Sequence, residues 1–368
     1  MGKRVLVAPL DWGLGHATRC IPVIWELQNQ DVEVVIGVGS DSSKHILQEV
    51  FPSNKFIEIN GYNISYPSNG NMAWSMMLKT PSILKRIKKE HNELDSFIEE
   101  FKLDAVISDN RYGLWSDKIY SILITHQLNI QTPNFLTVAK PVLGKLTDSF
   151  IKKFDECWIP DFKDENSLSG KLSINAKDSC LHIGPLSRFQ LSDNIPLRPP
   201  YRKGDYSQEK KWDITAIVSG PEPQRTIFEE LLITQLKSLD SRCLIIGGKP
   251  NIQENREIGT NITFVNHLSP NKFKEAILSS EILISRPGYS TIMDLYYLGA
   301  KAVFVPTPGQ TEQEYLADYH FSQGNFYSQE QNKFDIKTAL LNSGNYSRLI
   351  NKSTYNLNRT ISDFIARV

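Results

Sequence analysis

The chain has 368 residues, which suits two domains better than one, and its 41 Lys and Arg residues balance its 41 Asp and Glu residues. This neutral composition offers no general attraction to nucleic acid, so no nucleic-acid partner is expected. The cysteines have neither zinc-ligand spacing nor the density of a disulfide framework, which fits a reducing cytoplasm. The first residues lead directly into a strand rather than a signal peptide, and no apolar run reaches the roughly 18 residues of a membrane span.

Short apolar strands alternate with amphipathic helical segments in the first half of the chain, as in a parallel sheet with crossover helices. We expect strands at 5–10, 32–38, 56–59, 105–108 and 157–159, and helices at 17–28, 43–50, 74–101 and 116–128. A stretch rich in proline and charge follows, with Pro196, Pro199 and Pro200 ahead of the charged run 202–211. Such composition is typical of a linker, which places the domain boundary within about 185–210.

The same rhythm restarts after this linker. Strands are predicted at 214–218, 243–246, 262–265, 282–284 and 302–305, with helices at 224–236 and 271–279. We therefore predict an α/β chain with two Rossmann-like, doubly wound parallel-sheet domains at 1–195 and 205–345. A C-terminal helix within 346–368 is expected to pack back toward the first domain.

The segment from Ser285 to Asp294 carries the strongest functional signal. The strand at 282–284 ends in a turn with Gly288, and a helix is predicted to open at Ser290 or Thr291, where backbone N–H groups and the helix dipole favour a phosphate. Asp294 lies about one turn further on, within reach of ribose hydroxyls. The alternative is a capping box of Thr291 and Asp294 that needs no ligand.

This segment resembles the donor signature of GT-B glycosyltransferases, especially the family 28 enzymes that add GlcNAc to the peptidoglycan lipid intermediate, and glucuronosyltransferase-like enzymes. The family pattern maps onto Arg286, Gly288, Thr291 and Asp294, and its donor-sugar motif maps onto Gln313 and Glu314. The resemblance implies two domains facing a central cleft, with acceptor bound by the first and nucleotide-sugar donor by the second. The ribose acid is Asp rather than Glu, and Glu314 replaces a second Gln, so the donor sugar stays open.

The N-terminal loop resembles the glycine-rich first loop of the same enzymes, with Gly13 and Gly15 on the acceptor side. The resemblance implies that His16 is the catalytic base and that Asp109, at the end of a later strand, orients it. His126 resembles a further acceptor-side residue. The alternatives are that His16 only caps a helix, that Asp109 and Asn110 only form a turn, and that His126 is a solvated helix cap.

Three further positions would face the donor nucleotide. Gly220 and Arg225 follow the strand at 214–218 and open a helix, although a surface role for Arg225 is the alternative. Leu268 lies in a loop that resembles the one whose backbone contacts the base in the related enzymes. No Asp-x-Asp pair occurs in the chain, so we expect neither a metal ion nor another cofactor in the reaction.

The predicted reaction is inverting, metal-independent transfer from a UDP-sugar to a hydroxyl of a glycan, lipid or small molecule. A UDP-sugar 2-epimerase and a non-catalytic nucleotide-sugar-binding protein are the rival hypotheses. A dehydrogenase is disfavoured, because the third glycine of the dinucleotide motif is missing.

A cytoplasmic location is expected, with peripheral association at the inner face of the membrane as a further hypothesis. It rests on the apolar segment 72–78 followed by basic side chains, which are Lys79, Lys85, Arg86, Lys88 and Lys89. The alternative is a helix that packs Trp74, Met77, Leu84 and Ile87 into the first domain and leaves its lysines in solvent.

Overall fold

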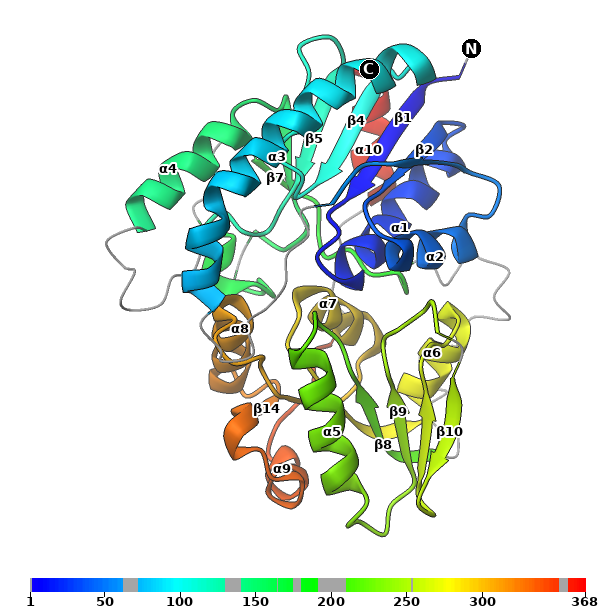
Figure 1. Cartoon of the computed structure of the whole chain (residues 1–368), viewed down its shortest axis with the longest axis vertical. Coiled ribbons are helices and arrows are strands. Elements are labelled where there is room, and N and C mark those ends of the chain that lie inside the picture. The colour runs from blue at the N-terminus through cyan, green and yellow to red at the C-terminus, as the bar shows by residue number, and fades with distance from the viewer. Residues whose placement is uncertain are drawn as a thin grey trace. The chain divides into compact units, whose positions relative to one another are not determined.

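A computed structural model describes residues 2–61, 72–129, 140–163, 165–174, 180–190, 210–252, 254–350 and 357–368. These residues form two compact units, and each unit is built on a seven-stranded sheet (Figure 1). The first unit holds β1 to β7, α1 to α4 and the C-terminal helix α10, and the second holds β8 to β14 and α5 to α9. The predicted α/β class with two doubly wound sheets is confirmed.

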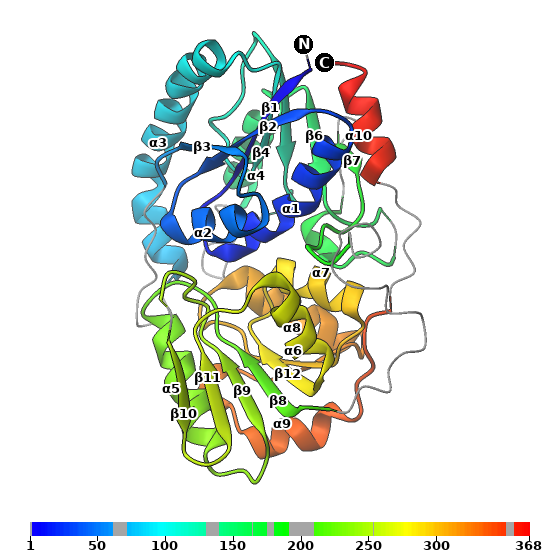
Figure 2. The same ribbon diagram turned by 90° about the vertical axis from the view of Figure 1, so that its right-hand side faces the viewer.

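The sheet of the first unit is parallel throughout and has the order β3-β2-β1-β4-β5-β6-β7. Its strands are β1 (Arg4–Pro9), β2 (Glu33–Val38), β3 (Lys55–Glu58), β4 (Ala105–Asp109), β5 (Tyr120–Ile124), β6 (Glu156–Ile159) and β7 (Cys180–His182). Its helices are α1 (Leu14–Asn29), α2 (Asp41–Val50), α3 (Met72–Phe101), α4 (Lys140–Ile151) and α10 (Leu357–Ile365). Central strands such as β1 and β4 are buried along almost their whole length because helices cover both faces: α3 lies on one side and α10 on the other (Figures 1 and 2).

The predicted helix at 116–128 is wrong. Residues Tyr120–Ile124 form β5, which pairs with β4 on one side and β6 on the other. The apolar run Ile122, Leu123 and Ile124 is too short to distinguish a buried strand from a buried helix by periodicity alone. The sheet decides for a strand, because this position between β4 and β6 buries the run completely.

The sheet of the second unit has the order β10-β11-β9-β8-β12-β13-β14, and only its edge strand β10 is antiparallel to its neighbour. Its strands are β8 (Trp212–Ile217), β9 (Cys243–Ile246), β10 (Asn255–Ile258), β11 (Ile262–Val265), β12 (Ser280–Ser285), β13 (Ala302–Phe304) and β14 (Tyr327–Ser328). Its helices are α5 (Gln224–Leu236), α6 (Pro270–Leu278), α7 (Tyr289–Leu298), α8 (Thr311–Ser322) and α9 (Ile336–Ser343). One face packs Phe228 and Leu232 of α5 against the strand residues Ile214, Ile245 and Ile284.

The chain passes from the first unit to the second between Ser187 and Arg188 and returns to the first unit at Ser353. The C-terminal helix α10 belongs to the first unit, where Asn358 Nδ2 donates to Glu26 of α1 at 2.6 Å. Phe364 of α10 also packs edge-on against Trp158 of β6, with ring centroids 5.9 Å apart. In the described part of the chain, no helix has the length and hydropathy needed to cross a membrane.

Candidate active site

The first cluster of functional side chains forms where β1 passes into α1. Gly13 precedes the helix with φ 77°, a backbone conformation that other residues adopt only with strain. The helix starts at Leu14, earlier than the predicted residue 17, so His16 lies in its first turn. Pro9 at the end of β1 is the register partner of Asp109 at the end of β4. The carboxyl ends of these two strands therefore bring His16 and Asp109 together.

His16 and Asp109 form a hydrogen-bonded pair. His16 Nδ1 lies 3.1 Å from Asp109 Oδ2, and the two side chains are 15% and 0% exposed. A carboxylate only accepts hydrogen bonds, so Nδ1 carries the proton and Nε2 keeps the lone pair. This is the arrangement of a general base that a buried carboxylate orients. Asn110 has φ 55°, as in a turn, and the Asp109 side chain in addition takes part in this cluster.

Arg19 is a member of the same cluster that the sequence analysis did not identify. Its Nε donates to Asp109 Oδ2 at 2.8 Å, and its Nη2 pairs with Asp109 Oδ1. Its Nη1 lies 3.2 Å from Nδ1 of His126, which is buried in the loop after β5. His126 is therefore not the solvated helix cap of the alternative interpretation. The signal for Arg19 was its position three residues after His16, which places both side chains on one face of a helix.

Burial and the neighbouring charges together set the pKa values of this cluster. Burial alone would raise the pKa of Asp109, but Arg19 and then His16 hold this pKa well below its usual range. Burial lowers the pKa of His16; Asp109 opposes that effect and Arg19 adds to it, so the pKa stays below its usual value. Burial and then Asp109 raise the pKa of the Cys20 thiol, whose Sγ lies 3.7 Å from Asp109 Oδ2. Near neutral pH the cluster holds one carboxylate, one guanidinium and a neutral imidazole at His16.

The second group of predicted residues lies at the start of α7 in the second unit. The helix begins at Tyr289 with Gly288 as its N-cap, which supplies no side-chain cap. The capping-box alternative is wrong, because Thr291 lies inside the helix rather than at its N-cap position. Ser290 and Thr291 are in the first turn, where the helix dipole favours an anion.

Asp294 follows one turn later and is paired with Arg188. Both Nε and Nη2 of Arg188 lie 3.1 Å from Asp294 Oδ2. The guanidinium also stacks on Phe273 of α6, with its Cζ 4.3 Å from the ring centroid. Arg188 is a second residue that the sequence analysis did not identify, and it holds the carboxylate predicted to bind ribose.

Arg286 is buried rather than displayed on the surface. It is 1% exposed, and its Nη1 donates to the carbonyls of Val305 at 2.9 Å and Pro306 at 3.1 Å. Its Nη2 donates to the carbonyl of Gln224 at 3.3 Å, and burial lowers its pKa to about 9. These contacts hold the loop after β13 to the start of α5. A contact of Arg286 with the nucleotide stays a prediction.

Arg225 is also buried, so the surface alternative is wrong. It contacts Glu222 and Glu229, and its Nη1 donates to the carbonyl of Gly247 at 2.6 Å. Gly220, in the loop after β8, has φ 104°, which again favours glycine. These contacts connect the loops that follow β8 and β9.

The predicted donor-sugar residues hold the loop between β13 and α8. Gln313 Oε1 accepts from the backbone of Thr307 at 2.9 Å, and Glu314 Oε1 accepts from Gly309 at 2.7 Å. Leu268 lies half-buried in the loop after β11. Because β8, β9, β11, β12 and β13 are parallel, their following loops share one edge of the sheet. Such an edge is the usual ligand-binding edge of a doubly wound fold.

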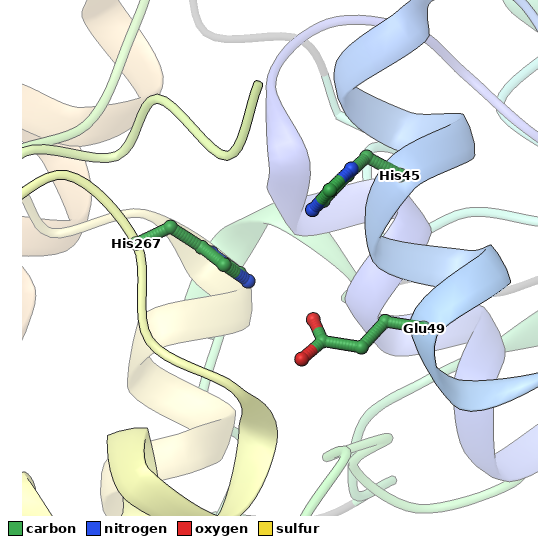
Figure 3. A group of neighbouring side chains, drawn as sticks. All are labelled: His45, Glu49 and His267. Atoms are coloured by element: carbon green, nitrogen blue, oxygen red, sulfur yellow. The ribbon is translucent and has the colours of Figure 1, made fainter. Parts of the chain in front are cut away.

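Potential metal ligands occur in both units but do not form a site within either one. His45 and Glu49 lie one turn apart on α2, and their side chains project from the same face of that helix (Figure 3). His267, also drawn there, belongs to the loop after β11. In neither unit by itself do three His, Cys, Asp or Glu side chains of the described residues converge for a metal ion.

The basic segment of the membrane hypothesis lies on α3. The side chains of 72–79, which include Trp74, Met77 and Lys79, are outside the described residues. Ile87 is buried, whereas Leu84 is 39% exposed, so only one of these two apolar side chains packs into the unit as the alternative expects. Arg86 and Lys89 both contact Glu93, at 3.2 Å and 3.4 Å, which offsets part of their charge.

Comparison with protein families identifies two matching domains. Residues 231–355 match the C-terminal domain of glycosyltransferase family 28, and residues 4–161 match glycosyl transferase family 1. An uncharacterized glycosyltransferase of Methanosarcina acetivorans is 25% identical over 326 residues, which cover 82% of this chain and 79% of the relative. A similarly described protein of Methanosarcina mazei is 26% identical over 328 residues, with the same coverage.

Solved structures share the fold along the whole chain. MurG of Acinetobacter baumannii superposes with a TM-score of 0.58 and 14% identity, covering 100% of both chains. The spinosyn rhamnosyltransferase SpnG superposes with a TM-score of 0.61 and 14% identity, covering 99% of this chain and 96% of SpnG. SpnG has also been solved in complex with thymidine diphosphate, with a TM-score of 0.58 to this chain. At these identities the likeness concerns the fold, which is that of GT-B enzymes.

Proposed function

Because the chain is a glycosyltransferase with the GT-B fold, we propose that it transfers a sugar with inversion from a UDP-sugar to an acceptor hydroxyl, without a metal ion. The observation that carries this proposal is the hydrogen bond between His16 and the buried carboxylate of Asp109. A hydroxyl is a poor nucleophile, so its transfer reaction needs a positioned base. Burial is the main cause of the lowered pKa of His16, and this lowered pKa keeps the imidazole in its proton-accepting form near neutral pH.

In the proposed step, Nε2 of His16 takes the proton of the acceptor hydroxyl as the oxygen bonds to the anomeric carbon. The bond between that carbon and the diphosphate oxygen breaks, and the nucleoside diphosphate leaves from the opposite face. Asp109 holds the imidazole in the required tautomer and stabilises the imidazolium during the step. The products are the glycosylated acceptor, the nucleoside diphosphate and one proton.

The second unit would bind the donor. The first turn of α7, with Gly288, Ser290 and Thr291, offers an anion the positive end of a helix dipole. Asp294 would accept hydrogen bonds from the ribose hydroxyls, as the resemblance to the family 28 signature implies. Gln313 and Glu314 would face the sugar, as the resemblance to the donor-sugar motif implies, and both also hold the loop between β13 and α8.

The nucleotide of the donor is the part of the proposal to test first. The chain is titrated with UDP, TDP and GDP, with and without EDTA, while its thermal unfolding is followed. A nucleotide at one hundred times its dissociation constant adds about 2.7 kcal/mol to the free energy of unfolding. We expect UDP to stabilise most and EDTA to change nothing. A larger effect of TDP would assign the donor to the nucleotide found in the SpnG complex.

The reaction itself is tested with labelled UDP-sugars and a panel of glycan, lipid-linked and small-molecule acceptors in buffer near neutral pH. Release of UDP together with a glycosylated product of inverted anomeric configuration is the expected result. Conversion of the UDP-sugar to an epimer without acceptor would contradict the proposal and favour a 2-epimerase.

A further inference from the structure

The imidazole of His16 and the guanidinium of Arg19 both contact the buried carboxylate of Asp109 in the first unit. Asp109 Oδ2 lies 3.1 Å from Nδ1 of His16 and 2.8 Å from Nε of Arg19. Its other oxygen pairs with Arg19 Nη2, so the guanidinium engages both oxygens at once. Bidentate pairing fixes the plane of a carboxylate more firmly than a single hydrogen bond does.

We propose that Arg19 is a positioning residue for His16: it fixes the Asp109 carboxylate and offsets its charge, which keeps the imidazole oriented and neutral. The inference rests on the proposed function, in which His16 is the base. Arg19 would touch neither donor nor acceptor, and would act only through Asp109 and the local electric field.

The physical argument concerns what Asp109 would do without Arg19. A lone carboxylate beside a buried imidazole raises the pKa of that imidazole, commonly by one to three pH units. An imidazolium has no lone pair and cannot accept the acceptor's proton. With Arg19 present the carboxylate and guanidinium together carry no net charge. Asp109 can then orient Nδ1 without holding His16 in its protonated form.

The remaining neighbours of this cluster add no opposing charge. Cys20 of α1 is a neutral thiol, because burial and Asp109 raise its pKa well above the usual value. Tyr112, after β4, is neutral as well, since burial raises its pKa to about 12. Arginine only donates hydrogen bonds, so Nδ1 of His126 accepts from Nη1 of Arg19. His126 thereby anchors Arg19 from the loop after β5.

The test is an NMR pH titration of the imidazole nitrogens of His16 in the full-length chain, assigned by comparison with His16→Gln. In the wild type we expect His16 to titrate below about 6.5, its ordinary pKa. In Arg19→Met the pKa should rise by about one to three pH units. The matched control is Arg4→Met, which breaks the Arg4–Glu33 pair at the opposite end of the same sheet and should not move the titration of His16.

An unchanged pKa of His16 in folded Arg19→Met would overturn the proposal. If that variant fails to fold, Asp109→Asn is compared with the Arg19→Met, Asp109→Asn double variant, which leaves no buried unpaired charge. We expect a lower pKa of His16 in Asp109→Asn than in the double variant, because the positive charge of Arg19 is then no longer offset by a carboxylate and disfavours the imidazolium. Equal values in the two variants would also overturn the proposal.

Activity separates this inference from the proposed function. In Arg19→Met the acidic limb of the pH profile of kcat/KM should shift to higher pH together with the pKa of His16. The dissociation constant of UDP should stay the same. Transfer activity that survives in His16→Ala would remove the proposed base, whatever the titration shows. A titration that responds to Arg19→Met supports the electrostatic role of Arg19 even if no transfer is detected.

Discussion

Arg188 Nε donates to Asp294 Oδ2 at 3.1 Å, and Nη2 of Arg188 forms an ion pair with the same oxygen at 3.1 Å, which fixes the carboxylate that the donor signature assigns to ribose. Arg188 is itself held by stacking on Phe273. The two partners are 106 residues apart in the chain. The pairing places the first residue of the segment Arg188–Lys352 beside α7.

We predict that Asp294→Ala weakens UDP binding by about 1.5–3 kcal/mol, the usual value of hydrogen bonds to a charged group. Arg188→Ala should weaken it less, because the carboxylate remains but is no longer fixed. Isothermal titration calorimetry measures both. Asp213→Ala, which breaks an Arg–Asp pair at the start of β8, is the control and should leave the affinity unchanged. Wild-type affinity in Asp294→Ala would exclude the ribose contact.

His16→Ala should lower turnover by about two to four orders of magnitude, the contribution of a positioned general base. The affinity for UDP should be unchanged, because His16 lies in the first unit and the predicted donor residues lie in the second. Steady-state kinetics with an identified acceptor gives the first quantity and calorimetry the second. Asp109→Asn should retain more activity than His16→Ala. Near-normal turnover of His16→Ala would rule out the dyad.

Arg286→Met should reduce the free energy of unfolding by about 3 kcal/mol or more, because it leaves several buried carbonyls without a donor. Urea unfolding of the variant measures the loss. Arg348→Met is the control, because the contact of Arg348 Nη1 with the carbonyl of Gly299, at 3.3 Å, is exposed to solvent. A loss of UDP binding without a loss of stability would instead indicate direct contact with the nucleotide.

The pKa values of the first-unit cluster predict loss of stability in acid. Burial lowers the pKa of His16 in the folded state, so the unfolded chain binds the additional proton and stability falls as pH drops below about 6.5. Asp109, whose pKa Arg19 depresses despite burial, gives stability above about 3.9 that is lost at lower pH. Chemical unfolding between pH 3 and 8 should therefore show a weaker pH dependence near pH 6 in His16→Gln, and the exposed-site variant His45→Gln is the control. An identical pH dependence in His16→Gln and wild type would contradict the assignment.

The membrane hypothesis predicts flotation of the chain with vesicles that contain anionic lipid at low salt. Because Glu93 engages Arg86 and Lys89, the positive charge available among the described basic side chains at 85–89 comes mainly from Lys85 and Lys88. Lys85→Glu with Lys88→Glu should abolish flotation, since attraction to the headgroups becomes repulsion. The exposed pair Lys237→Glu and Lys272→Glu in the second unit is charge-matched and should still float. No flotation of the wild type would end this hypothesis.

The residue pattern alone determined the fold class and the order of the functional loops. Local patterns can be recognised without knowing the order of the strands in the sheet. They include the alternation of apolar strands with amphipathic helices and the glycines at strand-to-helix turns, such as Gly13 and Gly288. They also predicted His16 near the start of a helix and Asp109 at a strand end. The short run around Ile122 was misassigned, because periodicity cannot separate a buried strand from a buried helix over so few residues.

Only the tertiary structure decided which charges meet. Arg19 and Asp109 are 90 residues apart, and they pair because the register places the end of β1 beside the end of β4. Arg188 and Asp294 are likewise distant in the chain and meet only in the folded unit, and so do Arg286 and the carbonyls that follow β13. The sequence does not indicate which group an arginine will pair with, because burial and pairing depend on how the strands and helices are arranged in the folded unit.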